Sequence, residues 1–275
     1  MDFFNALSTY SFLQNAVIAA LLASVSCGIS GTFVYVNRIT FIAGGIAHAV
    51  LGGVGAAVYF GIPPFAGAVF TALLFAVLLG MIRLKASQHE DTVIGAMWAC
   101  GMSAGIIFMY LTPGYAVNLN NYLFGNILLV SKNDIASLSV LAALVILIST
   151  LFFRQFKAVS FDEENATLHG VKSSLVYILM LSVIALTVVV LMKVVGLILV
   201  IAFMSLPAAT AAIFQRKVGG IIVFSIILSF IFSMSGLFVS YSWNLPTGAV
   251  ITLVSGAVYA IALLSRQVPR AQQRK

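Results

Sequence analysis

The stretch SLVYILMLSVIALTVVVLM, residues 174–192, runs for 19 residues without a single charge. An α-helix needs about 20 apolar residues to cross the hydrocarbon core of a bilayer, so this stretch has the length of a membrane span. Eight further apolar runs of similar length lie at 12–36, 40–60, 63–82, 93–112, 135–153, 195–213, 219–240 and 247–265. The pattern predicts an all-α, polytopic transmembrane helical bundle with eight or nine spans.

The overall composition supports the same conclusion. Hydrophobic residues make up 62% of the 275 positions and charged residues only 8%, against about 45–50% and about 25% in a soluble domain. A soluble fold of this size cannot bury so much apolar surface, whereas in lipid helices satisfy their own backbone and expose apolar side chains. The first ten residues lack the basic start and cleavage site of a signal peptide. We expect a multi-pass protein of the cell membrane, with one transmembrane domain over 1–275.

The basic residues sort to one side when the nine runs are threaded with the N-terminus outside. Twelve of the fourteen lysines and arginines then face the cytoplasm, namely Arg38, Arg83, Lys85, Arg154, Lys157, Lys172, Arg216, Lys217, Arg266, Arg270, Arg274 and Lys275. This positive-inside asymmetry predicts a cytoplasmic C-terminal tail, residues 266–275. The net charge of +7 is thereby explained by topology, and no nucleic-acid partner is expected.

The number of spans stays open between eight and nine. Gly196 and Pro207 interrupt the run at 195–213, and the segment 122–131 is apolar enough to dip into the membrane without crossing it. An eight-span arrangement would move the N-terminus inside. The two cysteines, Cys27 and Cys100, lie within apolar runs without the spacing of a zinc site or a disulfide framework, and we assign them a structural role.

All seven acidic residues lie at or near an expected water boundary. Secondary transporters and pumps usually place carboxylates within the membrane for their ion or proton sites. The distribution therefore disfavours a transporter driven by an ion gradient, although unwound backbone carbonyls also bind ions in some transporters.

His48 is the one ionisable residue well inside a predicted span. It belongs to FIAGGIAHAVLGGVG, residues 41–55, where positions 44, 48, 52 and 55 share one helical face and the other three are glycines. A neutral imidazole is the commonest transition-metal ligand, and the glycines are expected to leave room for an ion to pass. The alternative is a histidine that bonds to a neighbouring helix as packing glue.

The longest polar stretch between spans is FKAVSFDEENATLHGVK, residues 156–172, on the basic side. Its three acids, Asp162 to Glu164, suit the positive N-terminal end of a short amphipathic helix, and Gly170 is placed to end that helix. Such a helix could dock on a partner, or it could be a solvated connector on the membrane surface. His169 lacks companions at metal-ligand spacing and is expected to be a contact residue.

Four stretches of the chain resemble the permease subunits of zinc, manganese and iron ATP-binding-cassette importers. They are FVYVNRITFIAGGIAHAVLGG (33–53), EDTVIG (90–95), NYLFGNILLVSKNDI (121–135), and FDEENATLHGVKSSL with MKVVGLILVIAFMSLPAATA (161–175 and 192–211). The last is the most specific, because it pairs the polar loop with a Val-Gly…Pro-Ala-Ala-Thr-Ala span in the family's order. The resemblance covers nearly the whole chain.

The resemblance implies a permease that is not itself an enzyme. It would pair with a second copy, forming a homodimer around a central path, while two cytosolic ATPase subunits bind ATP and an extracytoplasmic metal-binding protein delivers the ion. No permanently bound cofactor is implied, only the transported divalent ion. The segment 158–172 would be the cytoplasmic coupling helix, in which Asp162, Glu164, Ala166 and Gly170 carry the contact to the ATPase.

The chain departs from the family pattern at one position. The family commonly places an aspartate one turn before the histidine that corresponds to His48, and here that residue is Gly44. His48 is then the single candidate metal residue of the translocation path. Two alternative functions stay open, a permease for a metal chelate such as a siderophore, corrin or haem, and a secondary metal-ion transporter without an ATPase. A non-transporting membrane scaffold has little in its favour.

Overall fold

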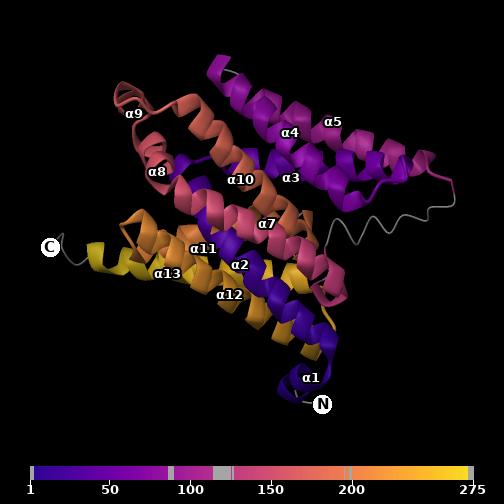
Figure 1. Ribbon diagram of the computed structural model, residues 1–275. Coiled ribbons are helices and arrows are strands. Elements are labelled where there is room, and N and C mark those ends of the chain that lie inside the picture. Colours follow the sequence, from indigo (N-terminus) through magenta and orange to yellow (C-terminus); the bar gives the residue numbers. More distant parts are fainter. Residues whose placement is uncertain are drawn as a thin grey trace.

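A computed structural model describes residues 3–85, 90–113, 125, 127–194, 196–197 and 200–271. Within these residues the chain is helical throughout, with no strand. The helices are α1 (Phe3–Thr9), α2 (Ser11–Asn37), α3 (Thr40–Tyr59), α4 (Pro64–Lys85), α5 (Glu90–Leu111), η2 (Ile127–Leu129), α7 (Lys132–Leu151), α8 (Phe153–Phe161), α9 (Glu163–Leu168), α10 (Ser173–Val194), α11 (Val200–Phe214), α12 (Val218–Trp243) and α13 (Thr247–Ala271). The predicted all-α bundle is confirmed (Figure 1).

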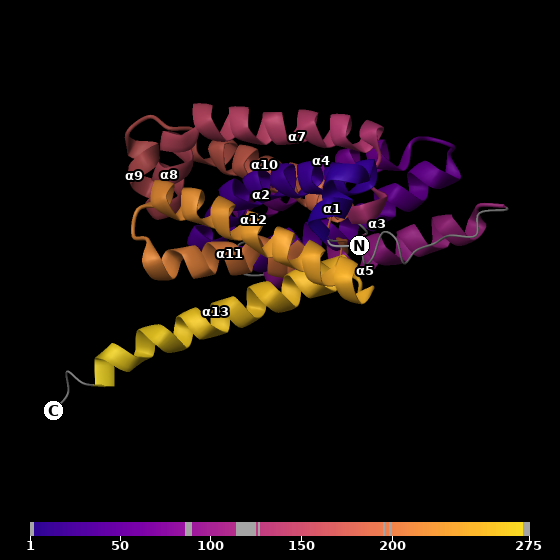
Figure 2. The ribbon, with the colours of Figure 1, turned by 90° about the horizontal axis from the view of Figure 1, so that it is seen from below.

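Eight of the described helices, α2, α3, α4, α5, α7, α10, α12 and α13, are long and apolar enough to cross a membrane. The ninth apolar run forms α11, which has 15 residues and measures about 22 Å at 1.5 Å per residue. Helix α1 and the end of α13 lie well apart in the bundle (Figures 1 and 2). The described residues thus contain eight helices of span length and one shorter apolar helix, α11.

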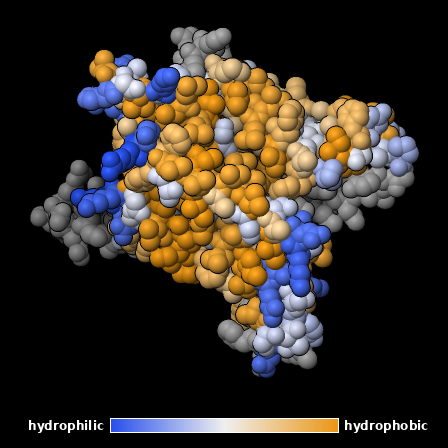
Figure 3. All heavy atoms as spheres, in the orientation of Figure 1, coloured by the Kyte–Doolittle hydropathy of each residue, from blue (hydrophilic) through white to orange (hydrophobic). Residues whose placement is uncertain are grey.

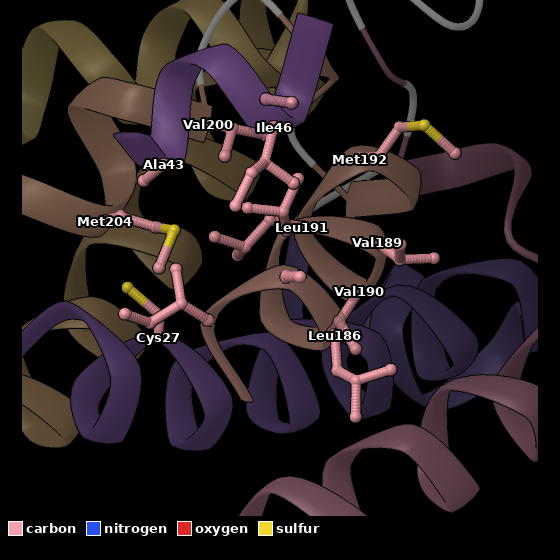
Figure 4. Close-up of a cluster of buried hydrophobic side chains, with 14 of the residues drawn as sticks. Cys27, Ala43, Ile46, Leu186, Val189, Val190, Leu191, Met192, Val200 and Met204 are labelled. Carbon is pink, nitrogen blue, oxygen red and sulfur yellow. The ribbon is translucent and has the colours of Figure 1, made fainter. Parts of the chain in front are cut away.

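Helices α2, α3 and α10 form the interior of the bundle and are buried over most of their length. Alanines line much of the inner surface of α2, and α10 contributes a continuous buried stretch from Val188 to Met192. Figure 4 shows how Cys27 of α2, Ile46 of α3, Leu191 of α10 and Met204 of α11 converge in one apolar cluster. Small residues let membrane helices approach closely, and close packing is the main attraction between helices in lipid.

Glycines fix how α3 meets its two neighbours. A Cβ placed on Gly101 of α5 would lie 2.5 Å from the Cα of Ala49, and one placed on Gly105 would lie 2.5 Å from the carbonyl oxygen of Leu51. On another side of α3, Gly53 faces Gly67 of α4 just as closely. Since no real side chain fits at these distances, α3 is held between α4 and α5 by backbone contact.

Acidic residues start the helices at the ends of the bundle. The side chain of Ser131 accepts a hydrogen bond from the backbone of Asp134, and the Asp134 carboxylate accepts one from the Ser131 backbone at 3.1 Å, which completes a capping box at α7. The space-filling view shows hydrophilic residues gathered at the extremities and an apolar surface between them (Figure 3). The described acidic residues Asp134, Asp162, Glu163 and Glu164 thus lie at helix starts, as expected for residues near the water boundary.

The segment 122–131 lies partly outside the described residues. Its described part includes η2, where Ile127 is fully buried, and Val130, whose carbonyl oxygen accepts a hydrogen bond from the Asn15 side chain at 3.3 Å. This part therefore packs on α2.

Candidate translocation and coupling sites

His48 lies in the middle of α3, about 12 Å along the helix from Thr40 at 1.5 Å per residue. Its side chain is 7% exposed. The imidazole stacks on the indole of Trp98 of α5, with ring centroids 4.0 Å apart and an interplanar angle of 8°. The Nδ1 atom is buried and has no hydrogen-bond partner. A buried imidazole nitrogen without a partner is costly, and a second group that satisfies it would stabilise the site.

Neighbouring helices come close to the three glycines on the His48 face, although Gly52 also lines a cavity of about 680 Å³. A Cβ on Gly44 would lie 2.5 Å from Cδ1 of Ile201 in α11, and one on Gly52 would lie 2.9 Å from the carbonyl oxygen of Gly101. Gly55 faces Gly105 as closely. At Gly44 and Gly55 the place of a side chain is thus taken by atoms of neighbouring helices.

One cavity adjoins Trp98, the stacking partner of His48. A cavity of about 320 Å³ is lined by Phe41, Ile94, Gly95 and Trp98. Among the residues that the structure describes, no group of three or more histidine, cysteine, aspartate or glutamate side chains is close enough to hold a metal ion. Within the described part of one chain, His48 therefore belongs to no group of three or more such ligands.

The two cysteines differ in their surroundings. Cys27 is buried and its thiol donates to the carbonyl oxygen of Phe203, with the sulfur 2.9 Å away. Cys100 is exposed and lines an almost wholly apolar cavity of about 680 Å³ between α3, α4 and α5. Both are free thiols, and neither surrounding offers the ligands of a metal site, in agreement with a structural role.

The polar stretch 156–172 spans the end of α8, the short helix α9 and the turn into α10. Asp162 is the N-cap of α9, and its carboxylate accepts a hydrogen bond from the backbone N–H of Asn165 at 2.9 Å. After α9, Gly170 has a φ of +83°, and the backbone N–H of Val171 donates to the carbonyl oxygen of Ala166 at 3.0 Å. The predicted helix start and stop are both confirmed.

Hydrogen bonds fasten α9 to the beginning of α10. The hydroxyls of Thr167 and Ser173 lie 2.7 Å apart, and Ser173 also donates to the carbonyl oxygen of Glu163 at 3.2 Å. Ala166 is the buried residue of α9, with 6% of its surface exposed. These hydrogen bonds thus attach the projecting helix α9 to the start of α10.

Two large apolar side chains stand exposed on this projection. Leu168 is 85% exposed and Phe161 is 66% exposed, although α9 lies at an end of the bundle rather than within the apolar belt (Figure 2). Phe161 also lines a groove of about 580 Å³, whose other lining residues are Arg154, Lys157, Ala158, Asp162, Asn165, Ala166, His169 and Val171. Exposed apolar residues rimmed by charges are typical of a protein interaction site.

Most of these residues were predicted separately from the sequence, and three were not. Glu164 and His169 are exposed on α9, as expected of contact residues, while Trp98, Phe161 and Leu168 were not singled out. A signal for Trp98 existed, because positions 94, 98, 101 and 105 share the face of α5 that carries its two packing glycines. Sequence periodicity does not say which helix that face meets.

The fold and these two sites define a multi-pass membrane permease with a short helix projecting from one end. The chain belongs to the ABC 3 transport family, which matches residues 9–266. It is 42% identical over 258 residues to an uncharacterized membrane protein of Synechocystis sp., covering 94% of this chain and 92% of that one. It is 31% identical to the manganese transport system membrane protein MntC of Halalkalibacterium halodurans, covering 94% and 89%.

A solved structure agrees with the fold assignment. The chain superposes on a chain of PsaBC from Streptococcus pneumoniae, solved in complex with Fab, with a TM-score of 0.86, 31% sequence identity and coverage of 94% of both chains. The family resemblance drawn from the four sequence stretches is thereby confirmed.

Proposed function

We propose that this chain is the membrane-spanning subunit of an ATP-driven importer of divalent transition-metal ions, with manganese, zinc and iron as the candidate ions. Family membership over residues 9–266 carries this proposal, and the relative named for manganese transport supports the class of ion. The whole chain, 1–275, acts as one permease domain and performs no chemistry itself. ATP is hydrolysed on a separate subunit.

The projection formed by α8 and α9 is the docking site for the ATPase. Leu168 and Phe161 supply apolar contact, and Arg154 and Lys157 at the groove supply positive charge for acidic residues of the partner. Asp162 and Gly170 set the geometry of α9, Ala166 anchors it to the bundle, and Glu164 is a contact residue. This assignment places α9 and the C-terminal tail in the cytoplasm, in accord with the positive-inside rule.

His48 contacts the ion in transit. Since one chain brings a single histidine to the path, we assign the complete site to a homodimer in which each copy contributes His48. Two imidazoles bind a transition metal weakly, and transport requires binding that is weak enough to release the ion. Two ATPase subunits below the dimer and an extracytoplasmic metal-binding protein above it complete the importer.

The test is uptake by proteoliposomes that contain the permease together with its ATPase and binding protein. With ATP available to the ATPase, we expect manganese(II) accumulation that persists when ion gradients are collapsed and that stops without ATP. His48→Ala is expected to lower uptake at limiting metal while ATP hydrolysis continues. Uptake that follows an ion gradient and ignores ATP would instead establish a secondary transporter.

A further inference from the structure

The last turn of α2 is tied to the coupling segment 158–172 by one side chain. The amide of Asn37 donates to the hydroxyl of Ser160 at 2.8 Å and to the carbonyl oxygen of Phe33 in its own helix at 2.8 Å. The Sδ atom of Met180 in α10 lies 3.6 Å from the same amide nitrogen. Asn37 therefore joins the end of α2 to the end of α8 and also contacts α10.

The residue after Asn37 makes the turn into α3. Arg38 has a φ of 59° and a ψ of 33°, a left-handed conformation that costs a residue other than glycine roughly 1–2 kcal/mol. Two backbone hydrogen bonds hold this turn, from Arg38 to Tyr35 at 3.2 Å and from Ile39 to Val34 at 3.1 Å. Helix α3 begins directly afterwards, at Thr40. A turn this tight passes a displacement of α2 to α3 rather than absorbing it.

Aromatic rings also pack between α2 and α8, but these contacts do not fix the position of one helix along the other. Phe33 meets Phe156 edge to face at 5.4 Å between ring centroids and Phe153 at 6.4 Å. Such rings slide over one another at small cost, whereas a hydrogen bond depends steeply on distance and angle. The contact between Asn37 and Ser160 is thus the part of the junction that fixes α8 in register with α2.

We propose that Asn37 is a positioning residue of the transport cycle, which carries movement of the coupling segment through Ser160 to the α2–α3 turn and so to His48. The inference rests on the proposed function, because it needs an ATPase that moves the segment 158–172. It adds a specific route from that segment to α3, which carries the candidate metal residue. Movement could instead pass through α10 and α4 without involving Asn37. Substitutions at Asn37 therefore distinguish the two routes.

The experiment measures manganese(II) imported per ATP hydrolysed by the complete complex in proteoliposomes. The variants are Asn37→Leu, Ser160→Ala and the two combined, with Ser160→Thr to restore the hydroxyl. Thr150→Ala is the matched control, because the Thr150 hydroxyl bonds only to carbonyl oxygens in its own helix. Gel filtration and melting temperature of each complex report on assembly and folding.

We expect Asn37→Leu and Ser160→Ala each to lower the metal imported per ATP by about fivefold or more, which corresponds to roughly 1 kcal/mol for one hydrogen bond. The double variant should lose much less than the sum of the two single losses, because both remove the bond between Asn37 and Ser160; the other contact of the Ser160 hydroxyl, to Sδ of Met180, is long at 3.8 Å. Ser160→Thr and Thr150→Ala should import metal normally. Assembly with the ATPase should be unchanged in every case.

Normal import per ATP in Asn37→Leu and Ser160→Ala, or strictly additive losses in the double variant, would overturn the inference in favour of the route through α10. Failure of the proposed function looks different. If Leu168→Glu, on the docking projection, leaves ATPase assembly and import untouched, the coupling segment has no coupling role, whatever the Asn37 variants do.

Discussion

The imidazole of His48 and the indole of Trp98 stack face to face across the α3–α5 interface, with ring centroids 4.0 Å apart and planes inclined by 8°. The stack covers one face of the imidazole and restricts its rotation, so that its ring nitrogens keep a fixed direction. Trp98 therefore lies against the histidine that we assign to the metal translocation path. It also lines the adjoining cavity.

Removing the indole should weaken the site without unfolding the bundle. We expect Trp98→Ala to raise the manganese(II) concentration for half-maximal uptake by about two- to tenfold, since an aromatic pair contributes roughly 0.5–1.5 kcal/mol. Trp98→Phe, which keeps an aromatic face, should lie close to the unaltered protein. An equal loss in both variants would show that stacking of an aromatic ring on His48 is not what supports uptake.

The pairing of His48 with Trp98 illustrates the limit of what the sequence could predict. Apolar runs gave the helices, and Asp162 and Gly170 gave the start and stop of α9, because these features act within a few residues of chain. The contact partners of Gly44 and Trp98 depend on which helices meet, and periodicity identifies a face without its neighbour. The shortness of α11 was in contrast indicated by the sequence, where Gly196 and Pro207 interrupt the apolar run.

Gly44 offers a direct test of the departure from the family pattern. The obstacle to a larger residue is Cδ1 of Ile201, the mobile end of a side chain, at 2.5 Å from the position of a Cβ. We expect Gly44→Asp combined with Ile201→Ala to add a carboxylate one turn from His48 and to tighten manganese(II) binding by about tenfold, or roughly 1.4 kcal/mol. Release should slow as binding tightens, so the maximal uptake rate should fall.

Gly44→Ala with Ile201→Ala is the control, because it makes the same space without a ligand. Binding of manganese(II) to the purified complex, followed by equilibrium dialysis, provides the measurement. Equal affinity in the aspartate and alanine variants would mean that position 44 does not face the ion, and the role of His48 in the path would weaken with it.

Leu168 should govern attachment of the ATPase. Its side chain is 85% exposed, and burial of a leucine contributes about 1.5–3 kcal/mol. We expect Leu168→Glu to reduce co-purification of the ATPase by tenfold or more, while the permease keeps its melting temperature. Asn165→Ala is the comparison, because Asn165 lies on the same helix and lines the neighbouring groove. It should reduce co-purification less.

Gly170 should be sensitive to backbone conformation rather than to side-chain size. No atom lies within 4 Å of the position that a Cβ would take, and the φ of +83° is the constraint. Gly170→Ala is expected to cost roughly 1–2 kcal/mol at the end of α9 and to weaken ATPase association. Gly170→Asn should be milder, since asparagine accepts the left-handed region more readily. Equal effects of the two variants on co-purification would point to lost contact area instead.

The close contact between α3 and α5 should make Gly101 important for stability, whereas Gly95 on the same helix should not be. A Cβ on Gly101 would meet the Cα of Ala49 at 2.5 Å, a backbone atom that can yield only if α3 and α5 separate. Gly95 has no atom within 4 Å of that position. We therefore expect Gly101→Ala to lower the melting temperature of the detergent-solubilised permease by several degrees, at a cost of roughly 1–3 kcal/mol for overpacking. Gly95→Ala should leave the melting temperature unchanged or raise it slightly, because alanine favours a helix by about 1 kcal/mol over glycine.

Equal melting temperatures for the two variants would mean that α3 and α5 separate easily. His48 and Trp98 would then not be held in a fixed stack.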